Sequence, residues 1–176
     1  MAENRAGGQA IARIDPDELE SLYCKCRQQL FTCALVITRS ATRAEDAVHD
    51  AFYQLLRGDP RPIDLKSYVF RAVRNAALSQ VRGSKRRDET LPDSVFDPGP
   101  YPDESAERAE LQRRVEHCLS ELSPDERETI VEHLFAELSF QEIATIRGAP
   151  LGTVVSWYRR GLEKLRARTE VSDGFV

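Results

Sequence analysis

The stretch Ser139–Arg160, SFQEIATIRGAPLGTVVSWYRR, reads as a short helix, a tight turn and a second helix. Gly148 lies between the two helices and tolerates the positive φ that such a turn needs, because it carries no Cβ. Ala144 is small enough for a close helix crossing, and Val154 supplies a compact apolar anchor that faces back from the second helix. These offsets predict a helix-turn-helix, with a plain three-helix packing unit as the alternative reading.

The second helix of this stretch is expected to run from about Leu151 to Arg168. Its apolar period places one set of side chains inside, namely Leu151, Val154, Tyr158, Leu162 and Leu165. The side chains left to face outward or flank the core are Thr153, Val155, Ser156, Trp157, Arg159, Arg160 and Lys164. Five Lys/Arg against a single Glu between residues 150 and 168 give this helix a local charge of +4. A segment that can enter the major groove, followed by basic residues for phosphates, is typical of a recognition helix.

The chain as a whole is acidic, with a net charge of −4, although positive charge on a protein favours binding to the phosphates of DNA. Its charge is segregated. Residues 88–128 hold thirteen Asp/Glu and four Arg, a local charge of −9, whereas residues 61–87 hold eight Lys/Arg and one Asp, a local charge of +7. The net charge therefore says little about either basic patch. Part of the acidic run could also lie over a basic face of the same chain and weaken DNA binding by the free protein.

Length and composition limit the size of the core and the number of domains. With 176 residues, 41% of them hydrophobic, the chain can bury one moderate core or two small ones. No apolar run approaches the length that spans a membrane, and the first residues lack the apolar core of a secretory signal, so a cytoplasmic protein without membrane insertion is expected.

Cysteine and histidine do not form a recognisable metal or redox motif. The chain has no C-x-x-C pair, and Cys26 and Cys33 fall on the apolar stripe of a predicted helix, where buried reduced thiols explain them. We therefore expect no metal and no cofactor. Whether Cys24, Cys26, Cys33 or Cys118 has a redox or metal role is left open.

The first half predicts a bundle of helices. Apolar residues at three- and four-residue spacing indicate a helix over residues 17–38. Thr42 and Glu45 then form a capping-box pattern that starts a second helix, whose polar side carries Asp46, His49, Asp50 and Gln54. Glycine and two prolines in residues 57–64 predict a loop before the third helix, which is expected over residues 64–82.

The third helix carries two stripes. One is an ordinary apolar core stripe. The other gathers basic groups, an amide and an aromatic ring: Phe70, Arg71, Arg74, Asn75, Leu78 and Arg82. Such a face suits single-stranded nucleic acid, because guanidinium groups meet phosphates and flat groups stack on exposed bases. A solvated basic face with Phe70 tucked into the core is the alternative.

The two halves are predicted to be separate small domains in an all-α protein. Residues 15–87 form the first domain, residues 88–106 a flexible acidic linker rich in proline, and residues 107–170 the second domain with the helix-turn-helix. Residues 111–122 have the period of an amphipathic helix. The sequence SPDE then places Ser123, Pro124 and Glu126 at the N-cap, first turn and capping-box positions of the next helix, and Ser139 with Glu142 repeats the box.

In this order, AEDAVHDAFYQLL, LKSYVFRAVRNAALSQVR, an acidic linker, LSPDERETIV and the helix-turn-helix segment resemble the extracytoplasmic-function (ECF) sigma factors of bacterial RNA polymerase, in the sigma-70 family. The resemblance covers residues 18–168. It implies an alternative sigma factor that directs core polymerase to specific promoters and promotes strand opening at the −10 element. It implies no catalytic group and no enzyme activity.

The resemblance also implies partners and sites. The first domain would bind the clamp coiled coil of one large polymerase subunit through Asp46, His49, Asp50 and Gln54, and the second would sit on the flap of the other. Residues 58–66 would form the pocket for a flipped −10 base, and the melted strand would lie against Arg61, Lys66, Phe70, Arg71, Arg74, Asn75 and Arg82. The duplex −35 element would meet Thr153, Val155, Ser156, Trp157, Arg159, Arg160 and Lys164. An anti-sigma factor is a further implied partner.

Three positions depart from the family pattern. Tyr68 stands where a tryptophan is common, and Val155 and Trp157 stand where basic residues are common. Val155 can make only apolar contacts, for instance with a thymine methyl group. The sequence therefore predicts neither the −35 sequence nor the regulon, the inducing signal or the anti-sigma partner.

Two other classes of protein are weighed against this reading. A stand-alone helix-turn-helix regulator would bind duplex operator DNA by itself, but it would leave the basic and aromatic face of the third helix unexplained. A metal-dependent enzyme using the carboxylates and His49 is disfavoured, because the acidic residues are spread along solvated helix faces without a converging ligand set.

Overall fold

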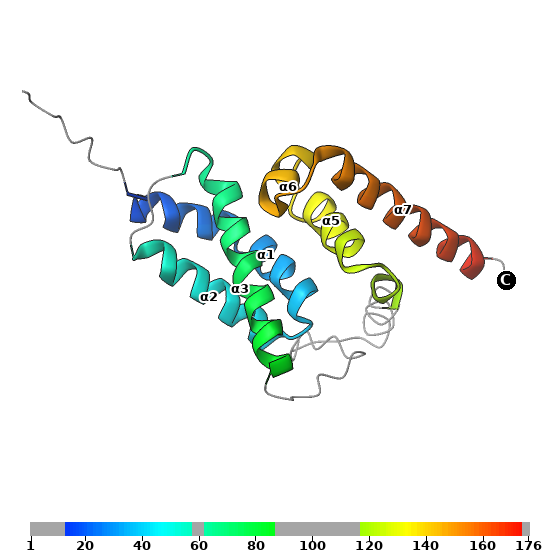
Figure 1. Cartoon of the computed structure of the whole chain (residues 1–176), viewed down its shortest axis with the longest axis horizontal. Coiled ribbons are helices and arrows are strands. Elements are labelled where there is room, and N and C mark those ends of the chain that lie inside the picture. Colours follow the sequence, from blue (N-terminus) through cyan, green and yellow to red (C-terminus); the bar gives the residue numbers. More distant parts are fainter. Residues whose placement is uncertain (1–12, 58–61, 87–116, 174–176) are drawn as a thin grey trace, which may run out of the picture.

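The computed structural model describes residues 13–57, 62–86 and 117–173, which are helical throughout most of their length (Figure 1). The first domain consists of α1 (Pro16–Thr38), α2 (Ala41–Leu56) and α3 (Leu65–Arg86). The second contains α5 (Pro124–Leu134), α6 (Phe140–Arg147) and α7 (Leu151–Asp173). The prediction of an all-α protein with two helical domains is confirmed. Residues 88–106, predicted as the linker, lie outside the described residues.

The turn between α1 and α2 corrects one predicted cap. α1 ends where Arg39 adopts a left-handed conformation, with φ of 53°. Ser40 follows as the N-cap of α2, its side chain accepting a hydrogen bond from the backbone N–H of Arg43. Thr42, which the sequence favoured as the cap, already lies inside the helix. The tight reversal at Arg39 fixes the start of α2 two residues earlier than the capping-box pattern indicates.

The third helix is longer than predicted. Asp64 precedes α3 and accepts a hydrogen bond from the backbone N–H of Ser67 at 3.2 Å. The helix then continues past Gly83 to Arg86, whereas the sequence predicted an end near Arg82. A glycine inside an exposed helix costs only about 1 kcal/mol relative to alanine, so it does not by itself end one.

The helix-turn-helix forms as predicted. Ser123 with Glu126 and Ser139 with Glu142 make complete capping boxes at the starts of α5 and α6. Gly148 ends α6 in the left-handed conformation, with φ of 62°. Both boxes and the glycine turn are local devices, which is why the sequence identified them.

One apolar position of α7 was predicted wrongly. Val154 is fully buried, as expected, but the side chain of Leu151 is 45% exposed. Leu151 is the first residue of α7, so it lies at the end of the helix rather than along the length that packs on the rest of the domain. Residues 111–116 of the predicted preceding helix lie outside the described residues.

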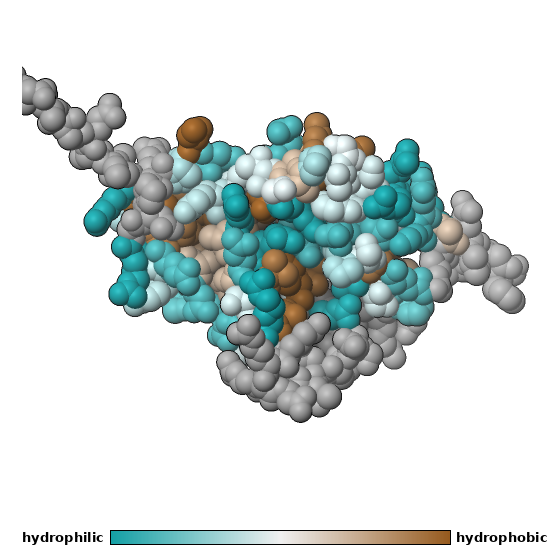
Figure 2. Space-filling view, in the orientation of Figure 1, coloured by the Kyte–Doolittle hydropathy of each residue, from teal (hydrophilic) through white to brown (hydrophobic). Residues whose placement is uncertain are grey.

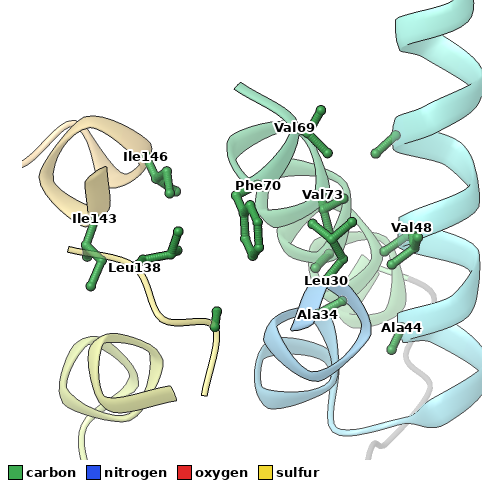
Figure 3. Packing of buried hydrophobic residues seen from close by; sticks show 14 of the residues in the cluster. Leu30, Ala34, Ala44, Val48, Val69, Phe70, Val73, Leu138, Ile143 and Ile146 are labelled. Carbon is green, nitrogen blue, oxygen red and sulfur yellow. The ribbon is translucent and has the colours of Figure 1, made fainter. Parts of the chain in front are cut away.

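A single cluster of buried apolar residues runs through both domains. Within the first domain α1, α2 and α3 pack against one another, and within the second α7 packs against α5 and α6. The two domains also meet directly, because α1 packs against α5 and α3 packs against α6. Figure 3 shows Phe70 on the side of α3 that faces Leu138 and Ile146 of the second domain.

Candidate nucleic-acid interface

The basic face of α3 is divided between the solvent and the second domain. Arg71, Asn75 and Arg82 are exposed. Lys66 and Arg74 are partly buried, and Phe70 is buried, with 4% of its surface exposed. The structure therefore places Phe70 in the core between the domains, which was the alternative reading of this residue. Arg61 lies outside the described residues.

Two ion pairs join this face to the second domain. Arg74 Nε donates to Glu128 Oε2 on α5 at 2.8 Å, and their side chains are only 18% and 8% exposed. Lys66 Nζ donates to Glu142 Oε1 on α6 at 3.2 Å. Glu128 belongs to the acidic run of residues 88–128, so part of that run does lie over a basic face of the same chain. In this arrangement two cations that the sequence assigned to DNA are neutralised within the protein.

Behind Glu128 lies a buried charged network centred on Arg147, whose side chain is 2% exposed. Its guanidinium pairs with Asp125, with Glu128 at 3.5 Å and with Glu132 at 3.7 Å. It also lies over the ring of Trp157, 4.8 Å from the centroid. These contacts tie α6 to α5 and α7 from the centre of the domain, because a buried cation must be compensated by nearby anions.

Glu132 is the least compensated member of this network. Its side chain is 6% exposed, and Oε2 has no hydrogen-bond partner. Burial raises the pKa of Glu132 to about 7; Arg147 and Arg74 lower it, whereas Glu128 raises it further. The carboxyl group therefore takes up a proton near neutral pH in the folded protein.

Replacing Glu132 with glutamine should change how stability depends on pH. In the wild type the raised pKa stabilises the fold below the usual carboxylate pKa of 4.5, and this contribution disappears as pH rises through about 7. We expect Glu132→Gln to match the wild type near pH 5 and to exceed its free energy of unfolding by about 1–3 kcal/mol at pH 8. Urea unfolding of both proteins from pH 5 to pH 8 checks this. A constant difference across that range would contradict it.

The recognition helix presents its predicted residues in different ways. Arg159 is 75% exposed and pairs with Glu163 on the same helix, and Val155 is 41% exposed. Thr153 is partly buried, as is Ser156, whose hydroxyl donates to the carbonyl of Gly152 at 2.7 Å. Trp157 is half-buried beneath the Arg147 guanidinium, and it packs against the core. Of the residues of α7 predicted to bind DNA, Val155, Arg159, Arg160 and Lys164 are the exposed ones.

Glu126 fixes two further cations of α7. Its Oε2 accepts from Lys164 Nζ at 2.7 Å, and its Oε1 lies 3.5 Å from Arg160 Nε. The cations remain about half exposed, while the Glu126 side chain is 5% exposed. Although burial opposes it, hydrogen bonds from Lys164 and Ser123 lower the pKa of Glu126. The carboxylate stays charged and anchors α7 to the first turn of α5.

The residues predicted to contact polymerase lie together on α2. Asp46, His49, Asp50 and Gln54 are all exposed, and Asp50 accepts a hydrogen bond from Gln80 of α3 at 3.3 Å. His49 also lines a groove of about 1000 Å³ between α1 and α2. Its walls include apolar side chains from both helices, so α2 combines an acidic outer face with an apolar flank. Across the view in Figure 2 most of the surface is hydrophilic, with an apolar strip between the two domains.

Among the described residues, no three His, Cys, Asp or Glu side chains converge in a way that could hold a metal ion. None of the described helices is both long and apolar enough to cross a membrane.

Sequence reasoning missed three residues that shape the site. Arg147 and Glu128 were not singled out, because their partners lie on other helices and leave no periodic pattern. Gly161 is buried where α7 crosses α5, and a Cβ built on it would lie 2.6 Å from Ile130 Cδ1. An isolated glycine within a helical pattern was the one signal that could have indicated this close approach.

Comparison with known proteins agrees with this architecture. The sequence model of sigma-70 region 2 matches residues 22–87, and that of sigma-70 region 4 matches residues 112–165. Among curated relatives, the ECF RNA polymerase sigma factor SigE of Mycolicibacterium smegmatis is 31% identical over 167 residues, which span 92% of this chain and 64% of the relative. The ECF sigma factor SigK of a Mycobacterium species (strain KMS) is 24% identical over 89% of this chain and 85% of its own.

The fold also matches a solved structure, that of the sigma factor RpoE from Bartonella quintana in complex with the anti-sigma factor NepR. The TM-score is 0.67, with 23% identity over 88% of this chain and 98% of that one. The region 2 match covers most of α1 and all of α2 and α3, including the basic face of α3. The region 4 match covers α5, α6 and most of α7, and so includes the helix-turn-helix. The chain therefore belongs to the extracytoplasmic-function sigma factors of the sigma-70 family.

Proposed function

We propose that this sigma factor reads promoters through two separate surfaces, the basic face of α3 and the exposed face of α7. The proposal rests on one observation: the second domain holds the predicted recognition helix α7 firmly in place, and the first domain carries a separate basic face on α3. Duplex reading alone accounts for α7, but it leaves Arg71, Asn75 and Arg82 on α3 without a role.

On α7, the exposed N-terminal half would enter the major groove of the −35 element. Val155 offers apolar contact to a base methyl group, while Arg159 and Arg160 lie further along the helix and reach phosphates or guanine edges. Trp157 and Arg147 support the helix from behind, because the guanidinium lies over the ring in the domain interior. Because one side of α7 is packed in this way, the helix would keep a fixed position, and only a few of its side chains would contact DNA.

On α3, the exposed arginines and Asn75 would bind the unpaired strand of the −10 element. A surface that binds only the unpaired form offsets the cost of unstacking the duplex, so strand opening is driven by differential binding and needs no catalytic group. Residues 58–66, which include the first two residues of α3, are proposed to bind a flipped base.

Core polymerase is the proposed platform for both surfaces. The exposed face of α2, with Asp46, His49, Asp50 and Gln54, would bind the clamp coiled coil, and the second domain would sit on the flap. The solved relative from Bartonella quintana was crystallised with an anti-sigma factor. We propose that a protein of this class also inhibits the present chain.

Reconstitution with core polymerase tests the function directly. We expect the purified protein to confer transcription from specific promoters. An Arg159→Ala/Arg160→Ala variant should reduce promoter binding by the holoenzyme roughly tenfold or more, and weaken its salt dependence by about one phosphate contact per arginine. Filter binding at several salt concentrations, combined with run-off transcription, measures both effects.

The matched control is Lys25→Ala, which removes an exposed cation of α1 that does not line the groove between α1 and α2. It should leave promoter binding within about twofold of wild type, as expected for an exposed residue with no contact to DNA. Failure to stimulate any promoter, combined with tight duplex binding by the isolated chain, would favour a stand-alone operator-binding regulator instead.

A further inference from the structure

The strand-binding face of α3 is the surface against which the second domain packs. Three of its predicted members, Lys66, Phe70 and Arg74, contact or face α5, α6 and the segment before α6. A single strand cannot lie along the covered part of this face, because the same cations cannot pair at once with phosphates and with the carboxylates of the second domain. The remaining members, Arg71, Asn75 and Arg82, are exposed.

The contact is more than a loose surface association. Arg74 and Glu128 are both largely buried and meet at 2.8 Å, and Phe70 beside them is 4% exposed. On the neighbouring side of the interface, burial and then the charges of Glu132 and Glu128 raise the pKa of the Cys33 thiol. Cys33 of α1 therefore lies within reach of the α5 carboxylates, and the interface extends from α3 to α1.

We propose that Arg74–Glu128 and Lys66–Glu142 form an interdomain latch that holds the free protein in a closed state and masks the strand-binding face of α3. The proposal rests on the function proposed above for α3. It adds that the acidic residues of the second domain compete with the DNA strand for the same cations. Strand binding then requires a partner that separates the domains.

The expected size of the effect follows from the population of the open state. A minor conformation that makes up about 1–10% of the molecules lowers the apparent affinity by the same fraction. Opening the latch should therefore raise the affinity for single-stranded DNA by roughly tenfold or more.

The test variant is Glu128→Gln/Glu142→Gln, which removes both carboxylate charges and leaves every residue of α3 intact. Glutamine at residue 142 keeps the capping box, since glutamine also serves at this position. Two measurements are made on the full chain: the affinity for a fluorescently labelled single-stranded oligonucleotide, and the labelling rate of Cys33 by a thiol reagent. Because the Glu128 charge itself raises the pKa of the Cys33 thiol, the labelling rate is measured on Glu142→Gln alone, which leaves Glu128 in place. For the second measurement Cys24, Cys26 and Cys118 are replaced with serine.

The matched control is Glu20→Gln/Glu137→Gln, which makes the same change in net charge at two exposed positions that form none of the ion pairs described above. It should move both readouts by less than about twofold, as for surface substitutions in general. Far-UV circular dichroism verifies that each variant is folded. Should the double variant unfold, Glu142→Gln alone retains the cap and should give smaller shifts in the same directions.

The expected result is faster Cys33 labelling in Glu142→Gln and tighter strand binding in the double variant, with loss of the gain in affinity when Arg71→Ala is added. An unchanged labelling rate would overturn the latch. Faster labelling with control-level strand affinity would overturn the masking of α3. Neither outcome depends on transcription by the holoenzyme, which tests the proposed function separately.

Discussion

Replacing Arg147 with methionine should destabilise the protein by about 3–5 kcal/mol, as for other buried ion pairs that lose one partner. Methionine fills a similar volume, but it leaves Glu128 and Glu132, which are 8% and 6% exposed, without their central cation. It also removes the guanidinium from the face of Trp157. Urea unfolding at pH 7.5, followed by circular dichroism, measures the loss.

Arg159→Met is the matched control, because Arg159 and Glu163 form an exposed pair on α7. Pairs of this kind contribute about 0–1 kcal/mol, so the control should remain near wild type. Adding Glu132→Gln to Arg147→Met should recover part of the stability, since it removes one of the two orphaned charges. Equal effects of Arg147→Met and Arg159→Met would contradict the structural role of the buried network.

The second large effect is expected at Gly161. An alanine Cβ there would lie 2.6 Å from Ile130 Cδ1 and 3.3 Å from Glu126 Cβ, so α5 or the isoleucine side chain must shift. Overpacking of this kind costs about 1–3 kcal/mol, which outweighs the gain of up to about 1 kcal/mol from placing alanine in a helix. Thermal unfolding of Gly161→Ala should therefore show a lower Tm than the wild type.

The chain offers a specific rescue for this clash. Ile130→Val deletes the Cδ1 atom that the new methyl group would meet, at a cost of about 0.5–1.5 kcal/mol by itself. The double variant should be more stable than the sum of the two single changes predicts, by at least about 1 kcal/mol. Gly152→Ala, where a Cβ meets nothing within 4 Å, should not destabilise the protein. Additive effects of Gly161→Ala and Ile130→Val would refute the close approach.

Local chemistry explains which parts of the fold could be predicted. The boxes at Ser123 and Ser139 and the left-handed Gly148 were read from the sequence, because each depends on residues within four positions. The cap of α2 was misplaced for the same reason, since Ser40 and Thr42 offer similar side chains two positions apart. The reversal at Arg39, with φ of 53°, decided between them.

Phe70 and Arg74 show where sequence reasoning ends. Their spacing on α3 correctly placed them together on one face, but it could not indicate what covers that face. Glu128 is 54 residues from Arg74, and Glu142 is 76 residues from Lys66. Only the packing of one domain on the other brings these charges together, and periodicity carries no information about it.

Two sets of contacts fix the position of α7 along α5. One is the ion pairs of Glu126 with Arg160 and Lys164, and the other is the close crossing at Gly161. Sliding α7 by one turn would bring Trp157 or Leu165 to the place where only a glycine fits above Ile130. α7 therefore cannot slide along α5 or rotate about its own axis without breaking these contacts. In the proposed complex with −35 DNA, the positions of Val155 and Arg159 relative to the base pairs would therefore be set by the packing of α7 on α5.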